Sequence, residues 1–299
     1  VQLTVAGPTT LVQDDGTSVD VVVVEQTGGG GTTQGFPQKH YIDPETRDLV
    51  RTEVSAPGME VVILPVSQES VDAAAAARRA METAADQRRL TPGSSDLVPV
   101  PVQTITYAVR LVQPSVQDLG TAAVTETVDG DRLTIVTDLN LPAAGQMQQD
   151  STVVMLSTLE PLARTRTSPQ ETSQITFSDG RAMGTVTENG VATELDVEMD
   201  GSFGGGMTRR IMRSLPFEDG LVASFRQLGA DGEFSISRIS VTGQEDYTTS
   251  DGDTVRVWTV VEVEDSQPDY TYYVDVETRE LLRTTFEPQP GVLVEIVAP

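Results

Sequence analysis

The chain has 299 residues, 45 of them acidic and 20 basic, which gives a formal net charge of −25 and a pI near 4.2. This balance argues against nucleic-acid binding and against docking on anionic membranes, because both need basic surfaces. No apolar run is long enough to cross a bilayer as a helix. Cysteine is absent, which excludes disulfides, thiolate metal sites and cysteine nucleophiles. The composition indicates a soluble, acidic, globular protein.

Arginine supplies nearly all of the basic residues, since Lys39 is the single lysine. This usage fits either a GC-rich genome or a high-salt habitat. The chain begins at Val1 without a methionine, so we expect an upstream segment, for which a cleaved export signal is the natural candidate.

An internal repeat is the clearest feature of the sequence. Residues 41–53 match residues 273–285, with eight of thirteen positions identical, and the similarity extends in both directions. Residues 1–65 therefore duplicate about residues 237–299. The repeat predicts a partial β domain over 1–65, a helix and linker over 66–97, and a full β domain over 98–299. Either the first copy is a half-domain, or its front half lies upstream of Val1.

The repeated core reads Tyr-x-Asp-x-Glu-Thr-Arg-x-Leu in both copies. Asp and Thr bond to nearby backbone groups in turns, so this pattern predicts a strand–turn–strand hairpin rather than a ligand site. The hairpin residues are Tyr41, Asp43 and Arg47 in the first copy, and Tyr273, Asp275 and Arg279 in the second.

Two helices are expected. Residues 66–90 combine a capping Ser67, an alanine run and a Thr-Pro-Gly stop, which predicts a linker helix, followed by a Pro-rich linker over 92–101. A second, short helix is predicted over 207–214, after the glycines 204–206.

The chain from 102 onward alternates apolar and polar residues, which is typical of β-strands. The expected strands are 104–111, 122–127, 132–136, 151–156, 173–177, 184–187, 193–198, 234–240, 254–262 and 270–274. Asp-Gly and Asn-Gly pairs separate many of them and favour tight hairpins. The fold class is therefore mainly β, with curved antiparallel sheets.

Candidate chemistry is sparse. The Asp-Gly-Asp triplets at 129–131 and 251–253 lack the further ligands of a calcium loop, so we interpret them as turns. The glycine runs 28–31 and 204–206 do not follow phosphate-binding patterns, and we interpret them as loops, with a hinge as the alternative for the second. His40, replaced by Tyr272 in the other copy, is interpreted as a surface strand residue. We predict no metal site, no cofactor and no enzymatic activity.

The stretch from Val241 through Trp258 to Arg283 resembles the C-terminal half of an uncharacterised exported bacterial family. The resemblance rests on a Gly-x-Glu sequence, a Gly turn, an aromatic-bearing strand and the Tyr-Val-Asp-x-x-Thr-x-x-Leu-Leu-Arg hairpin at 273–283. That family is similar to the LolA/LolB lipoprotein carriers. The resemblance implies an open β half-barrel whose concave face binds acyl chains. This chain has few helical segments to form a lid, and few aromatic residues to line a pocket.

Three hypotheses follow for function. The first is a non-catalytic, extracytoplasmic protein that acts as a scaffold or binds a hydrophobic ligand such as a lipid or lipoprotein. The second is a structural subunit of an envelope, filament or surface assembly that pairs through open sheet edges. The third is a carboxylate-dependent hydrolase, for which no residue set stands out. The expected partners are a lipid or other protein subunits, and the expected location is the periplasm, outer membrane or cell surface.

One candidate surface follows from the alternation around Trp258. Arg256, Trp258 and Val260 project to one side of their strand, and we predict that this side faces a ligand or a partner. The alternative is that Trp258 packs beneath the helix predicted over 207–214.

Overall fold

The computed structural model of the chain describes residues 2–12, 18–27, 37–56, 59–63, 68–113, 115–264, 268–289 and 291–299. The chain divides into two compact units, Val1–Arg78 and Arg79–Pro299. The boundary falls inside helix α1 (Gln68–Gln87), which confirms the helix predicted over 66–90 apart from its ends. Val66 and Ser67 lie outside the described residues, as do the glycines 28–31.

The first unit is a five-stranded antiparallel meander in which each strand pairs with the next one along the chain. Its strands are β1 (Gln2–Val12), β2 (Ser18–Thr27), β3 (Gln38–Ile42), β4 (Leu49–Ala56) and β5 (Met59–Ile63).

The second unit is built on a 16-stranded, almost entirely antiparallel sheet. One meander runs from β7 outward to β14, and another runs from β16 to β21; the last strand, β21, pairs with the first, β7. The first meander consists of β7 (Thr104–Gln113), β8 (Gln117–Asp129), β9 (Arg132–Leu141), β10 (Gln146–Met155), β11 (Pro161–Thr167), β12 (Glu171–Ser178), β13 (Arg181–Glu188) and β14 (Val191–Glu198), with a 3-10 turn at Pro142–Ala144. The second consists of β16 (Val222–Leu228), β17 (Phe234–Thr248), β18 (Thr254–Glu264), β19 (Tyr270–Asp275), β20 (Leu281–Gln289) and β21 (Val292–Val297).

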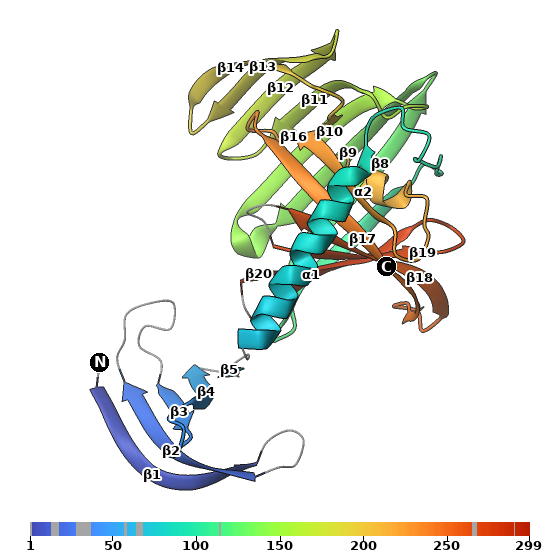
Figure 1. Cartoon of the computed structure of the whole chain (residues 1–299). Helices are drawn as coiled ribbons and strands as arrows, with labels where there is room; N and C mark the ends of the chain where they lie inside the picture. Colours follow the sequence, from blue (N-terminus) through green and yellow to red (C-terminus); the bar gives the residue numbers. More distant parts are fainter. Residues whose placement is uncertain are drawn as a thin grey trace. The chain divides into compact units, whose positions relative to one another are not determined.

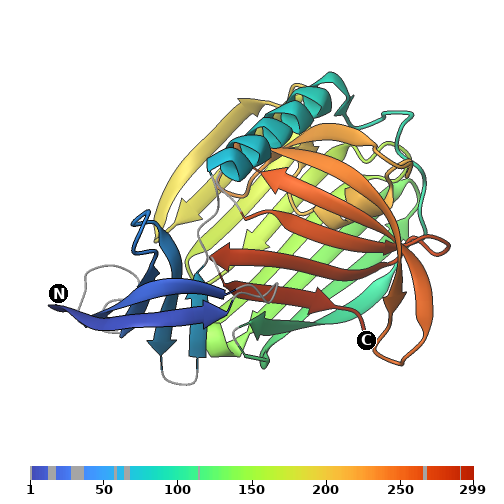
Figure 2. The ribbon, with the colours of Figure 1, turned by 60° about the horizontal axis from the view of Figure 1, so that its bottom comes forward.

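This wide sheet curls around the short helix α2 (Thr208–Arg213), which lies on its inner side (Figures 1 and 2). The sheet is not closed into a barrel. The prediction of curved antiparallel sheets with one long and one short helix is therefore confirmed. No helix among the described residues is both long and apolar enough to span a membrane.

Three of the longer strands of the sheet, β11, β16 and β21, are absent from the sequence prediction. In β11 the inward positions are held by arginines, Arg164 and Arg166, so the apolar alternation is inverted. In β16 three consecutive residues, 223–225, are buried, so the period of two is lost. The two-residue strands β6 (Arg89–Leu90) and β15 (Phe203–Gly204) pair with β16 in parallel and are too short for any pattern.

Of the five Asp-Gly and Asn-Gly turns that join paired strands of the second unit, two have positive φ at both residues, and the other three have it at the glycine only. Asp179 and Gly180 both have positive φ, at 51° and 72°, and join β12 to β13. Asn189 and Gly190, at 49° and 82°, join β13 to β14 in the same way. Two consecutive positive φ values are the signature of a type I′ hairpin.

The hydrophobic core of the second unit lies between the inner face of the sheet and α2. Tyr107, Leu133, Phe203, Ile211 and Phe225 have no exposed surface. A smaller cluster under β12–β14 completes the packing and consists of Ile175, Phe177, Ala182, Met199 and Leu228. Burial of these side chains provides the main stabilisation of the sheet.

Strands β1–β5 have the same order and antiparallel pairing as β17–β21, although β20–β21 carries a bulge that β4–β5 lacks. Tyr41 pairs with Val23 as Tyr273 pairs with Thr259, and both sets carry a bulge directly after that tyrosine. The first strand of each set has a bulge ending at a glycine, Gly7 or Gly243. The residues 41–53 and 273–285 thus have the same secondary structure, as the sequence repeat requires.

Candidate functional site: a buried polar network and a ligand cavity

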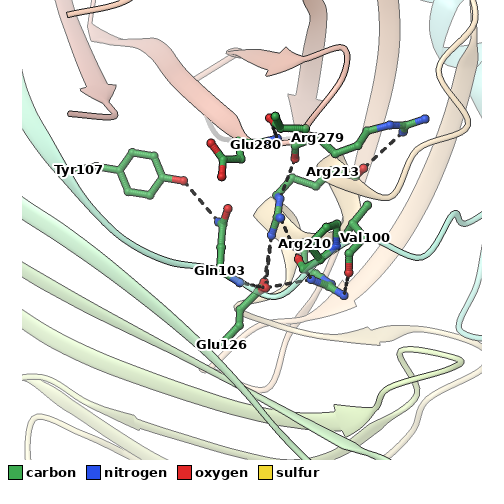
Figure 3. A network of polar contacts seen from close by, with 10 residues as sticks. Val100, Gln103, Tyr107, Glu126, Arg210, Arg213, Arg279 and Glu280 are labelled. Carbon is green, nitrogen blue, oxygen red and sulfur yellow. Dashed lines mark hydrogen bonds and ion pairs between the residues drawn. The ribbon is translucent and has the colours of Figure 1, made fainter. Parts of the chain in front are cut away.

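A buried polar network fixes α2 to the inner face of the sheet (Figure 3). Arg210 and Arg213 are three residues apart, so both point from the same side of the helix. Their shared partner is Glu126 of β8, which alternates in phase with the buried Ala122 and Val124 and therefore points inward.

The two guanidinium groups share one carboxylate. Arg210 lies 2.9 Å and Arg213 3.3 Å from Glu126 Oε2, and all three side chains are at least 96% buried. The carbonyl oxygens of Val100 and Pro101 accept the remaining bonds, at 2.8 to 2.9 Å. Burial lowers the pKa of Arg210, and Arg213 lowers it further, while Glu126 opposes both effects. The network has one uncompensated positive charge, which these carbonyl dipoles stabilise.

The hairpin of the second repeat copy also contacts α2. Arg213 Nε donates to the carbonyl oxygen of Arg279 at 2.8 Å, and Arg279 Nη1 donates to that of Leu215 at 2.5 Å. The Arg279 guanidinium lies 4.6 Å above the centre of the Phe217 ring. Asp275 shapes the turn, because its Oδ1 accepts two backbone N–H groups at 2.6 and 2.8 Å. Tyr273 stacks on Tyr247.

In the first copy the hairpin is built in the same way, but its arginine is exposed. Asp43 Oδ1 accepts the N–H groups of Glu45 and Thr46, and Tyr41 donates to Glu53 at 2.8 Å. Arg47 has a φ of +66°, matching +62° at Arg279. The six hairpin residues therefore have the turn-forming geometry that the sequence suggests.

The three residues predicted to form a ligand or partner surface around Trp258 differ in exposure. Trp258 is half-buried and stacks on Phe217 at 5.6 Å between ring centres. Val260 has no exposed surface, and Arg256 is exposed and pairs with Asp246 at 2.9 Å. Trp258 thus contacts the segment directly after α2, which is the arrangement of the packing alternative.

His40, interpreted as a surface strand residue, lies in strand β3. His40 is half-buried, and its ring nitrogens contact Thr52 Oγ1 at 3.0 Å and Gln26 Oε1 at 3.2 Å. Three neighbouring strands supply these groups, and hydrogen bonding holds the imidazole in place.

The corresponding positions of the second copy hold Tyr272, Thr284 and Glu262. Tyr272 donates a short hydrogen bond to Glu262 Oε2. Burial raises the pKa of Glu262, and the nearby hydroxyls of Ser237 and Tyr272 oppose the shift in part. These residues are buried among the core side chains.

A second buried ion pair, between β10 and β11, also contacts β16 of the other meander. Arg164 of β11 makes two bonds to Asp150 of β10, at 2.5 and 3.1 Å, and donates to the carbonyl oxygen of Leu228 in β16 at 3.1 Å. Gly205 is required here, because a Cβ atom would lie 2.2 Å from Arg164 Nη1 and 2.6 Å from Leu228 O. The glycines 204–206 therefore allow a close approach, which replaces the interpretation as a simple loop.

A cavity of about 550 Å³ lies beside this junction, and we call it the hairpin cavity. The β10–β11 and β12–β13 turns, the segment after β14 and residues 91–93 surround it. Its apolar walls are Pro92, Met155, Pro161, Leu162, Phe177 and Met199. Its volume is typical of small-molecule sites, which are largely apolar with a few polar groups.

One polar group in this cavity has no partner. Ser202 lines the cavity and is 2% exposed, and its Oγ makes no hydrogen bond within the described structure. A buried hydroxyl without a partner is costly, so a ligand with a polar end would gain by bonding to it. Arg181 and Asp179 line the more exposed side of the cavity.

A second cavity, of about 590 Å³, lies between β11–β12 and the β16–β17 hairpin. Its lining is predominantly charged and polar, including Arg166, Glu171, Asp231, Glu233 and Glu264. Among the described residues no group of carboxylates and imidazoles is arranged to hold a metal ion.

A match to a known protein family shows which family this chain belongs to. Residues 104–295 match the family described as "Protein of unknown function (DUF3108)". The chain belongs to this family. No curated protein matches the DUF3108 chain. Among solved structures it is similar to the hypothetical lipoprotein YmcC from Escherichia coli K12, with 16% identity, a TM-score of 0.24, and coverage of 78% of this chain and 97% of that one.

The DUF3108 match includes Glu126, Arg210 and Arg213 and most of the hairpin cavity, but not residues 91–93 or the first unit. Sequence reasoning named none of these network residues, because charged residues in strands and helices are usually solvated. One sequence feature indicates the inward position of Glu126: it follows Ala122 and Val124 at alternate positions of its strand, where apolar residues face the core.

Proposed function

We propose that this DUF3108 chain is a non-catalytic, extracytoplasmic binding protein whose hairpin cavity holds an apolar or amphipathic molecule of the lipid class. The observation that carries the proposal is a cavity of about 550 Å³ with six apolar side chains in its walls and one buried hydroxyl, Ser202, that has no partner among the described residues. An acyl chain would contact the methionine and proline side chains, and a polar end would bond to Ser202. The extracytoplasmic location is supported by the resemblance to exported carrier proteins.

The cavity chemistry supports binding rather than catalysis. His40, the single histidine, belongs to the first unit. Arg181, the cation beside the cavity, is paired with Asp196 at 2.6 Å. No nucleophile paired with a general base is formed by the described lining residues, and such a pair is the usual requirement for covalent hydrolysis.

The experiment measures binding of a pyrene-labelled fatty acid to the purified chain. Ser178 is exposed and lines the cavity, so Ser178→Trp fills it, whereas Thr176→Trp lies two residues away on the same strand and outside the cavity. We expect the probe to bind the wild-type chain and the Thr176 variant, and to lose affinity for the Ser178 variant. Equal binding to both variants, or none to the wild type, would contradict the proposal.

A matched change tests the polar end of the ligand. Ser202→Ala keeps the apolar walls and removes the unpartnered hydroxyl. We expect a several-fold weaker affinity for the fatty-acid probe, since one hydrogen bond contributes about 1 kcal/mol. An unchanged affinity would show that the carboxylate of the probe does not reach Ser202.

The second candidate function, a structural subunit that pairs through sheet edges, is favoured by the first unit. Within the described residues, β1 and β5 each pair with one neighbour only. Such edges are templates for strand addition.

A further inference from the structure

The two sheets have three long or accessible edges among the described residues: β1 and β5 in the first unit, and β14 in the second. An unpaired edge strand exposes backbone N–H and C=O groups to pairing with another chain. Proteins usually protect such edges with charged residues, prolines, bulges or very short strands.

Two of these edges carry such protection. Strand β14 has Glu194, Asp196 and Glu198 on alternate positions, and self-pairing would bring like charges together. Strand β1 has a bulge at Gly7 followed by Pro8, which cannot donate a backbone hydrogen bond.

Strand β5 differs from both. Its sequence is Met-Glu-Val-Val-Ile, with one charged residue and no proline or glycine, and it pairs with β4 without a bulge.

The strand of the second unit that corresponds to β5 has a neighbouring strand on the equivalent edge. Ile63 pairs with Thr52 as Ile296 pairs with Thr284, so β5 corresponds to β21. The other edge of β21 is occupied by β7, which runs antiparallel to it, with Ile296 opposite Val109. An antiparallel strand is therefore the neighbour that this edge takes in the complete unit.

We propose that β5 pairs with β5 of a second copy of this chain, giving a twofold dimer with one continuous sheet of ten strands. A twofold axis perpendicular to the sheet makes this pair antiparallel, as at β21–β7. Centred on Val61, the register places Val61 opposite its own copy and Met59 opposite Ile63. Glu60 then lies opposite Val62, so no like charges face each other.

The net charge makes this dimer dependent on salt. Each copy carries −25, so approach of two copies is opposed at low ionic strength and becomes easier as the repulsion is screened. The dimer is independent of the hairpin cavity, because β5 and the cavity belong to different units.

The test uses single-cysteine variants, which are unambiguous because the chain has no cysteine of its own. Directly opposed residues of an antiparallel pair lie about 4.5–5.5 Å apart between Cα atoms, which a disulfide can span. We expect Val61→Cys to form a disulfide-linked dimer under mild oxidation at high salt. Val191→Cys, at the exposed β14 edge, is the matched control and should remain monomeric.

Sedimentation of the unmodified chain provides the second measurement. We expect a mass of twice 32.0 kDa at high salt and a shift toward 32.0 kDa at low salt. Val61→Lys places two positive charges opposite each other and should shift the chain to monomer. A monomeric wild type at all salt concentrations, or equal crosslinking at Val61 and Val191, would overturn the proposal, even if Val61→Lys fails to fold.

Discussion

Glu126 is the single carboxylate that compensates two buried arginines, so its removal has a large effect. Without Glu126, Arg210 and Arg213 stay buried with only carbonyl partners. Removing one partner of a buried ion pair costs about 3–5 kcal/mol. We therefore expect Glu126→Ala to lower the free energy of unfolding by about that amount.

Denaturant unfolding checks this expectation, with Asp118→Ala as the control. Asp118 also pairs with an arginine, Arg110, at 3.2 Å, but its side chain is 84% exposed. Exposed pairs contribute about 0–1 kcal/mol. Equal losses in the two variants would show that burial of the network has no energetic weight.

Glu262 predicts a pH effect with a defined sign. Burial raises the pKa of Glu262 above its ordinary value of 4.5. The folded state therefore holds the proton of Glu262 more tightly than the unfolded state does. The stability that this gives is fully present below the pKa of the unfolded chain, and it is lost as the pH rises through the pKa of the folded protein. Glu262→Gln keeps the shape and cannot ionise, and glutamine occupies the corresponding position, Gln26, in the first copy.

Melting temperatures measured across a pH series check this effect. We expect Glu262→Gln to melt above the wild type at neutral pH, with the difference shrinking as the pH falls toward 4.5, the ordinary pKa of a glutamate. A constant difference at all pH values would mean that Glu262 does not titrate on unfolding in this range.

At the scale of elements, the two repeat hairpins form a matched experiment. Arg47 and Arg279 both have positive φ, which costs a non-glycine residue about 1–2 kcal/mol. Arg47 is exposed, so Arg47→Gly should stabilise its hairpin by about 1 kcal/mol. Arg279 bonds to Leu215, so Arg279→Gly loses a charged hydrogen bond of about 1.5–3 kcal/mol and should destabilise.

The test is that the two glycine substitutions change stability in opposite directions. Hydrogen exchange of the β3–β4 amides follows the first hairpin, and denaturant unfolding follows the second. Stabilisation by both glycines would mean that the Arg279 contacts with the α2 segment contribute less than the backbone strain they impose.

The hairpins and helices were predictable because their signals are local. Asp-Gly and Asn-Gly pairs favour tight turns by themselves, and an alanine-rich run forms a helix without any distant contact. Strands β11 and β16 were not predictable, because their burial depends on partners far away in the sequence. Arg164 is inward only because Asp150 and Leu228 receive it.

The hairpin cavity was not predicted from the sequence, for the same reason. A tryptophan next to an arginine is typical of an interface, yet Phe217, forty-one residues earlier, covers Trp258. The hairpin cavity is formed by four separate segments, and local patterns such as the Asp179-Gly180 turn do not show that these segments come together.

At the scale of the whole molecule, the net charge of −25 opposes the folded state. Compact structure brings 45 carboxylates together, and salt screens their repulsion over a distance that falls from about 10 Å at 0.1 M to about 3 Å at 1 M. We expect the melting temperature to rise over this range of sodium chloride.

Potassium chloride at the same ionic strength is the control, because screening does not depend on the identity of the cation. A melting temperature that stays constant, or falls, would contradict a dominant role for charge repulsion. A rise with only one of the two cations would indicate specific binding instead.

The pairing of β21 with β7 has a consequence for how the chain acquires its structure. Every strand of the first unit pairs with its neighbour in sequence, so β1–β5 can form while the rest of the chain is still being synthesised. The second edge of β7 must wait, because Ala108 pairs with Val297, far later in the sequence. Until β21 has been synthesised, that edge of β7 remains unpaired, and an unpaired strand edge is prone to aggregation.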